Sequence, residues 1–166
     1  GGTEENLKKF YTALYHCYQL PRIGSDVNGS YPGFAQDTLI HYAAGFDYYD
    51  DFSMWDTYRA LHPLMTILEP ERTLHMVKSL IAKAEQGGWM PIFPAWSNYT
   101  AAMIGDHVSA MISDAYIKGI KDFNIDTAYF YMRKNAFNQP SSDEYKDGKG
   151  RRALASYLKY GYIPLE

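Results

Sequence analysis

The sequence lacks the features that mark several classes of protein. It has one cysteine in 166 residues, which excludes an internal disulfide and a cysteine-rich zinc site. Its formal net charge is −3 and it contains no block of Lys or Arg, so it has no electrostatic footprint for nucleic acid. It has no phosphate-binding glycine loop, no HExxH and no GxSxG, and its five histidines show no metal-ligand spacing.

Long hydrophobic runs are missing as well. The longest uncharged run, residues 86–105, contains glycines, prolines and several Ser, Thr and Asn residues, which predicts loop rather than a membrane span.

Aromatic residues, in contrast, make up 16% of the chain, and 16 of them are tyrosines. Exposed aromatics are typical of a partner surface or a ligand cleft. The chain begins without Met, and we expect residues 1–166 to be a single segment of a longer protein.

The spacing of apolar residues predicts an all-α fold. Leu7, Phe10, Leu14 and Tyr18 recur at steps of three and four, which predicts a helix over residues 3–20 that ends at Pro21. By the same pattern, further helices are expected over residues 53–68 (with a kink or break near His62, caused by Pro63), 70–87, 101–121, 126–136 (capped by Asp126) and 150–160.

These six helices suggest three helical hairpins, as in a bundle, a solenoid or part of a toroid. Two aromatic loops, residues 21–51 and 88–100, interrupt them, and Asn28-Gly29 in the first loop is a tight-turn signal compatible with a β-hairpin. The polar stretch 138–150 is predicted to be turn.

The densest group of chemically active side chains lies in residues 52–63. On a helix, Asp56 is adjacent to Arg59, and Trp55, Arg59 and His62 share one face. A carboxylate beside a guanidinium and an indole suits a sugar, because the polar pair holds hydroxyls and the ring stacks on the pyranose. The alternatives are a capping box between Ser53 and Asp56, or a structural ion pair.

Two further groups carry open alternatives. Asp106 and Ser109 lie on one face of a predicted helix, beside His107, and form either a hydrogen-bonded solvated face or the wall of a cleft. The aromatic loop contributes Trp89, Trp96 and Tyr99, which are either core residues or a sugar platform. Cys17 is expected to be buried and inert.

Several motifs, taken in this order and spacing, resemble the catalytic domain of the family 92 glycoside hydrolases, the calcium-dependent exo-acting α-mannosidases. The resemblance covers nearly the whole chain. The segments that carry it are residues 11–16 (YTALYH), 52–64 (FSMWDTYRALHPL), 87–91 (GGWMP), 103–107 (MIGDH), 114–120 (DAYIKGI) and 160–164 (YGYIP).

This resemblance implies that the chain is the first half of an (α/α)6 toroid. It implies inverting release of terminal α-linked mannose, with an α-1,2 linkage expected, by a general-acid Glu and a general-base Asp outside this segment. Calcium is implied for the full-length enzyme, with no ligand in this chain. Asp56 and Arg59 would bind the terminal mannose, and the weaker candidates are Trp55, His62, Asp106 and His107.

The resemblance further implies mannose-containing glycans as partners and a periplasmic or secreted location. We also expect the segment to self-associate through the exposed seam of the half-toroid. Two other hypotheses stay open from the residues alone. One is a non-catalytic carbohydrate-binding helical module, and the other is a helical interaction domain whose aromatics form its core.

Overall fold

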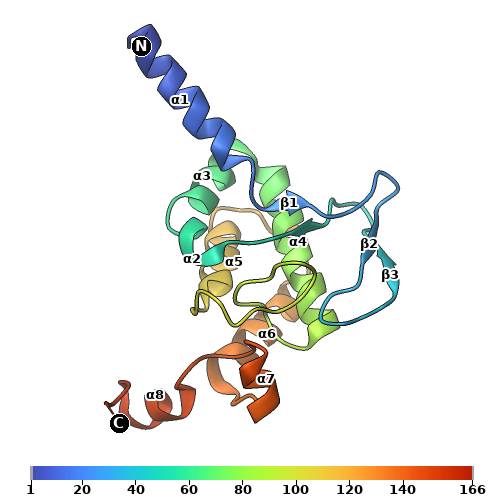
Figure 1. Ribbon diagram of the computed structural model, residues 1–166, viewed down its shortest axis with the longest axis vertical. Helices are drawn as coiled ribbons and strands as arrows, with labels where there is room; N and C mark the ends of the chain where they lie inside the picture. Colours follow the sequence, from blue (N-terminus) through green and yellow to red (C-terminus); the bar gives the residue numbers. More distant parts are fainter. Residues whose placement is uncertain (1, 166) are drawn as a thin grey trace.

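Eight helices and four short strands make up residues 2–165, the part of the chain that the computed structural model describes (Figure 1). The helices are α1 (Glu4–Cys17), α2 (Met54–Thr57), α3 (Leu61–Leu68), α4 (Pro70–Gly87), α5 (His107–Ile117), α6 (Ile125–Phe137), α7 (Ser142–Lys146) and α8 (Leu154–Tyr160). The strands are β1 (Arg22–Ile23), β2 (Ser30–Pro32), β3 (Ile40–Tyr42) and β4 (Tyr49–Asp50). The predicted helical fold class is confirmed. No helix of residues 2–165 is long and apolar enough to cross a membrane.

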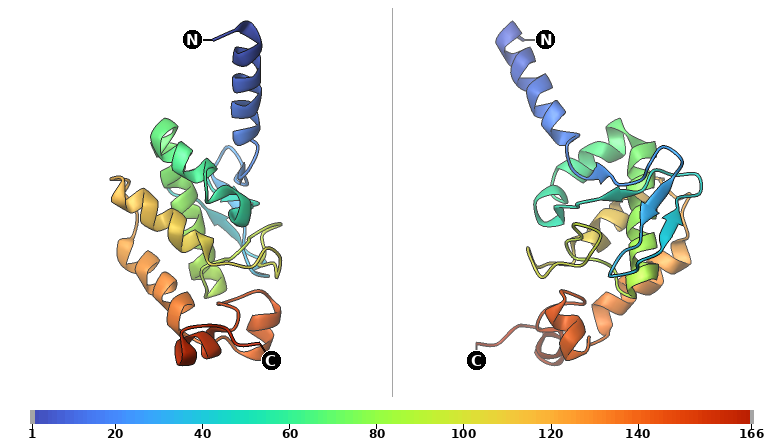
Figure 2. Two further views of the ribbon diagram at one scale, coloured as in Figure 1. Left: turned by 90° about the vertical axis from the view of Figure 1, so that its left-hand side faces the viewer. Right: turned by 45° about the vertical axis from the view of Figure 1, so that its right-hand side comes forward.

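Helix α4 is the centre of the core. Its buried face, which includes Val77, Leu80 and Ala84, packs against α3, α5, α6 and β4. Pro70 begins this helix, and Gly88 ends it with a left-handed φ of 82°. Helix α1, in contrast, projects away from the body and has no buried residue (Figures 1 and 2). Cys17 is therefore half-buried, and the prediction that it is buried was wrong.

The predicted helix over residues 53–68 is two helices, and the predicted break lies at residues 58–60, just ahead of the expected place near His62. Pro63 is the third residue of α3, where a missing backbone N–H removes no helical hydrogen bond. The first helical bond of α3 runs from the N–H of Leu64 to the carbonyl of Ala60. Pro63 thus lies in the first turn of a helix and does not bend one.

Other boundaries also differ from the sequence prediction, including the start of α8, which is Leu154 and not residue 150. The helix expected from residue 101 begins only at His107, because Met103 has a φ of 48°. The cap of α6 is Asn124, whose side chain accepts from the N–H of Thr127, and not Asp126. The stretch predicted to be turn contains α7, which begins with a capping box between Ser141 and Glu144.

The first aromatic loop forms two antiparallel pairs, β1 with β4 and β2 with β3. The turn at Asn28-Gly29 precedes β2, and the β2–β3 hairpin closes through residues 33–39. Phe34 from this hairpin packs with Trp89 and Tyr99 in a second core cluster. These two aromatics of the second loop are core residues, whereas Trp96 is 81% exposed.

Candidate functional site

The surface of α2 presents an aromatic ring with a cation stacked on it. The guanidinium of Arg59 lies 4.2 Å from the ring centroid of Trp55 and 4.9 Å from that of Tyr58. One of its nitrogens donates to the carbonyl of Trp55 at 2.7 Å. Met54, which is fully buried, anchors the short helix, and Trp55 stays 41% exposed. A spacing of four residues on one helical turn brings the indole and the guanidinium together.

The carboxylate of Asp56 is exposed beside this stack. Its Oδ2 atom accepts from the hydroxyl of Ser53 at 2.7 Å, so the serine side chain does not cap the helix. Within residues 2–165, neither Asp56 nor Arg59 takes part in an ion pair with another side chain. Both structural alternatives for this pair, the capping box and the ion pair, are thus not formed. The carboxylate and the guanidinium keep hydrogen-bonding capacity for a ligand.

His107 extends the stack from α2 to the start of α5. Its ring lies parallel to that of Tyr58, with the centroids 4.2 Å apart and an angle of 10° between the planes. Gly105 allows this position, because a Cβ there would lie 2.3 Å from Nε2 of His107. Partial burial, and then the nearby charge of Arg59, hold the pKa of His107 below its usual value. The Nε2 atom of this ring is buried and has no hydrogen-bond partner among the described residues.

Asp106, the neighbour of His107, is already paired. Its Oδ2 atom accepts from Nε and Nη2 of Arg151 at 2.8 and 2.6 Å, and its Oδ1 atom accepts from Ser109 at 3.0 Å. The Asp106 side chain is only 7% exposed. Asp106 therefore stabilises the start of α5, and its oxygens are already engaged by protein groups. Arg151 is a site residue that the sequence did not indicate, since 45 residues separate the two partners.

A cavity of about 360 Å³ opens beside this ion pair. Its lining is mostly apolar, with Asp106, Arg151 and Arg152 at its border. Its lining is Ile92, Ile104, Gly105, Asp106, Arg151, Arg152 and Ile163.

His62 does not belong to the exposed surface, which corrects the prediction that it shares a face with Trp55 and Arg59. It lies in α3, beyond the break at residues 58–60, and is 1% exposed. Its Nε2 atom is 2.9 Å from the hydroxyl of Thr57. Burial lowers the pKa of His62 to about 4. This histidine packs beneath the surface and has no access to a ligand there.

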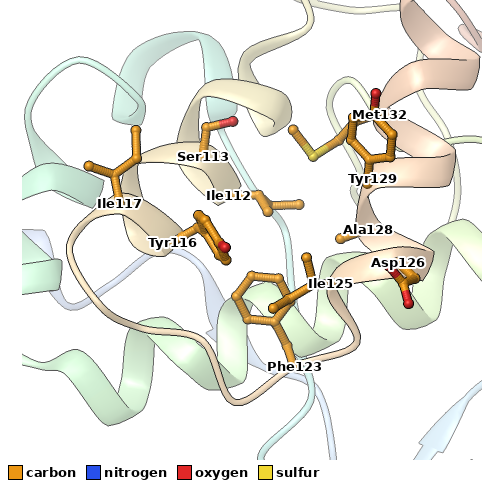
Figure 3. A pocket seen from close by; sticks show the side chains of 10 residues that line it. All are labelled: Ile112, Ser113, Tyr116, Ile117, Phe123, Ile125, Asp126, Ala128, Tyr129 and Met132. Carbon is orange, nitrogen blue, oxygen red and sulfur yellow. The ribbon is translucent and has the colours of Figure 1, made fainter.

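A more apolar groove lies elsewhere, between α5 and α6, with a volume of about 380 Å³ (Figure 3). Tyr116, Phe123 and Ile125 converge on it in Figure 3, and the side chains of Ile112 and Met132 form its far wall. Its polar lining side chains are few, and they lack the convergent set that fixes the hydroxyls of a sugar. The surface of α2 is the better candidate for a polar ligand.

Comparison with known proteins covers the whole chain. A model of the glycosyl hydrolase family 92 catalytic domain matches residues 1–166. The GH92 α-mannosidase BT3965 of Bacteroides thetaiotaomicron is 33% identical, with a TM-score of 0.82 over 95% of this chain and 20% of that one. The GH92 inverting mannosidase BT2199 of the same organism is 30% identical, with a TM-score of 0.84 over 99% of this chain and 22% of that one. Among curated proteins there is no match.

These likenesses confirm the helical fold class predicted from the sequence, although residues 2–165 form eight helices where about six, in three hairpins, were expected. The chain spans about a fifth of the length of those two solved structures.

Proposed function

Because this chain belongs to glycosyl hydrolase family 92, we propose that it is part of the catalytic domain of an exo-acting α-mannosidase. In this proposal the surface of α2 binds the terminal mannose of an α-linked glycan, with the α-1,2 linkage as the expected one. Two solved relatives are named as mannosidases, and the name of BT2199 gives its mechanism as inverting.

The single observation that carries the proposal is the open trio on α2. Trp55 offers a half-exposed indole, Asp56 offers a carboxylate without a cationic partner in residues 2–165, and Arg59 offers a fixed guanidinium. The C–H face of a pyranose packs on an aromatic ring, while its vicinal hydroxyls donate to a carboxylate and accept from a guanidinium. A hydrogen bond to a charged group contributes about 1.5–3 kcal/mol. Asp56 and Arg59 therefore orient the sugar in this proposal.

The remaining candidates act around this trio. His107 stacks on Tyr58, which in turn contacts Arg59, so the histidine supports the guanidinium from the side of α5. Asp106 holds the start of that helix through Arg151. We propose that both residues form the wall of the sugar site and that neither is an acid or a base in the reaction. The general acid and general base of an inverting hydrolysis are assigned to the rest of the catalytic domain.

Calcium dependence is likewise proposed for the whole enzyme. No group of three or more His, Cys, Asp or Glu side chains within residues 2–165 is placed to hold a metal ion. The proposal takes the calcium ligands from elsewhere in the enzyme, on the family resemblance alone. A periplasmic or secreted location is proposed on the family resemblance alone.

The test is a calorimetric titration of this chain with methyl α-mannoside. We expect Asp56→Asn to weaken binding by about tenfold or more, since the charged hydrogen bond becomes a neutral one. The matched control is Asp143→Asn, which changes an exposed carboxylate on α7 and should bind as the wild type does. Equal affinity of the Asp56 variant and the wild type would contradict the proposed site.

The same titration addresses the other two hypotheses. A helical interaction domain would not bind the mannoside. A non-catalytic sugar module would bind it, but the complete protein would not release mannose from α-mannobiose.

A further inference from the structure

Trp96 occupies an unfavourable position at the tip of a tight turn. Ala95 and Asn98 exchange two backbone hydrogen bonds of 3.1 Å, and the two residues between them, Trp96 and Ser97, have φ values of 53° and 57°. Turns with positive φ at both central residues favour Asn and Gly, and a bulky side chain is strained there. Burial does not compensate the strain, because the indole is 81% exposed. Contacts within residues 2–165 therefore give no packing reason for a tryptophan at this position.

The turn is held rigidly against the segment that leads into α2. Asp51 accepts from the N–H of Trp96 at 3.0 Å, and Asp50 accepts from the N–H of Ser97 at 2.8 Å. Asp50 is in turn paired at 3.0 Å with Lys83, a fully buried lysine of α4. The indole is thus presented on a preorganised backbone, which lowers the entropic cost of binding a ligand.

Two of the three group types found at α2 are available for a ligand near Trp96. The other oxygen of Asp51 pairs with Arg22, whose side chain is 62% exposed. Trp96, Asp51 and Arg22 are here called the Trp96 platform; the indole and the guanidinium are exposed, and the carboxylate is already engaged by both. A hydrogen bond from the N–H of Phe52 to the carbonyl of Pro94 joins this turn to the chain just ahead of α2. Figures 1 and 2 show the loop between α4 and α5, coloured yellow-green, beside α2 in every view.

We propose that the Trp96 platform is a second sugar subsite, which binds a hexose ring of an oligosaccharide whose terminal mannose lies on α2. The indole stacks on the apolar face of that ring, and the guanidinium of Arg22 donates to its hydroxyls. The proposal rests on the proposed function for the identity of the glycan. It goes beyond that function because a second subsite would make the enzyme prefer oligosaccharides that are longer than a disaccharide.

The experiment compares the affinities of this chain for methyl α-mannoside and α-mannotriose by calorimetry. An aromatic stacking contact is worth about 2- to 10-fold in affinity. We expect Trp96→Ala to weaken trisaccharide binding by that factor and to leave monosaccharide binding unchanged, and Trp96→Phe to restore most of the loss. The matched control is Tyr42→Ala, which removes an aromatic side chain of β3 that is 67% exposed, and it should alter neither affinity.

A second variant separates binding from folding. Trp96→Gly relieves the positive φ, so we expect the Tm to rise by about 2–4 °C while trisaccharide affinity falls as in Trp96→Ala. Unchanged trisaccharide affinity in both variants, or no trisaccharide binding by the wild type, would overturn the proposal. The proposed function fails differently: Asp56→Asn would then leave mannoside binding unaltered, while Trp96→Ala would still weaken trisaccharide binding.

Discussion

Acid should destabilise this chain through one buried histidine, His62. The folded chain keeps this ring neutral, because burial lowers its pKa from 6.5 to about 4. The unfolded chain exposes the ring, which then binds a proton at its ordinary pKa. Between those two values the unfolded state binds more protons than the folded state, so stability falls as the pH falls. The contribution of His62 to the free energy of unfolding is complete above pH 6.5 and is lost as the pH falls to about 4.

The size of the effect follows from the shift. A difference of one pKa unit corresponds to about 1.4 kcal/mol, so the span from 6.5 to about 4 amounts to about 3 kcal/mol. The free energy of unfolding of a domain is commonly about 5–15 kcal/mol, so this loss is a large share of it. His62 is 1% exposed, and solvent screening therefore reduces the effect little.

The assay is urea unfolding at pH 7.5 and at pH 4.5, for the wild type and for His62→Gln, which cannot take up a proton in this range. We expect the wild type to lose about 2–3 kcal/mol more than the variant between the two pH values. His16→Gln changes an exposed histidine of α1 and should follow the wild type. Equal losses in the wild type and His62→Gln would refute the assignment of His62 as a buried neutral residue and would reopen its role in the sugar site.

Three other outcomes are expected. Arg151→Gln should lower the free energy of unfolding by about 1–2 kcal/mol in urea titrations, since it leaves the carboxylate of Asp106 with 7% exposure and no cation. The chain alone should release no mannose from α-mannobiose, even at high protein concentration with calcium, because the acid and the base are assigned elsewhere; clear turnover would refute that assignment. Sedimentation at micromolar concentration should show self-association through exposed apolar side chains such as Phe10 and Tyr129, and a strictly monomeric chain that binds no hydrophobic dye would contradict it.

The sequence predicted those helices in which the apolar repeat continues over many residues and whose ends have clear capping signals. Helix α4 has the predicted bounds, because Pro70 suits its first turn and Gly88 its left-handed end. Helix α7 was missed because it is short and has no buried residue. A signal for it existed, since Ser141 and Glu144 have the spacing of a capping box.

For the site, local contacts were predictable and distant ones were not. Trp55 and Arg59 are four residues apart on one turn, so their contact follows from helix geometry. The same reasoning failed for His62, because it assumed a helix that continues through residues 58–60. The pair of Asp106 with Arg151 joins residues 45 positions apart, and no local pattern in the sequence reports such a contact.

The second aromatic loop shows what a sequence leaves undecided even when the residue types are right. Trp89, Trp96 and Tyr99 lie within eleven residues, and composition gives the same two interpretations for each of them. Tertiary contacts separate them: Trp89 and Tyr99 pack with Phe34, while the turn at Trp96 is held outward by Asp50 and Asp51. The backbone at Trp96 is strained, and its side chain contributes little to the core. A residue that is unfavourable for its turn and unnecessary for packing is a candidate for binding, and here that reasoning selects one aromatic of the three.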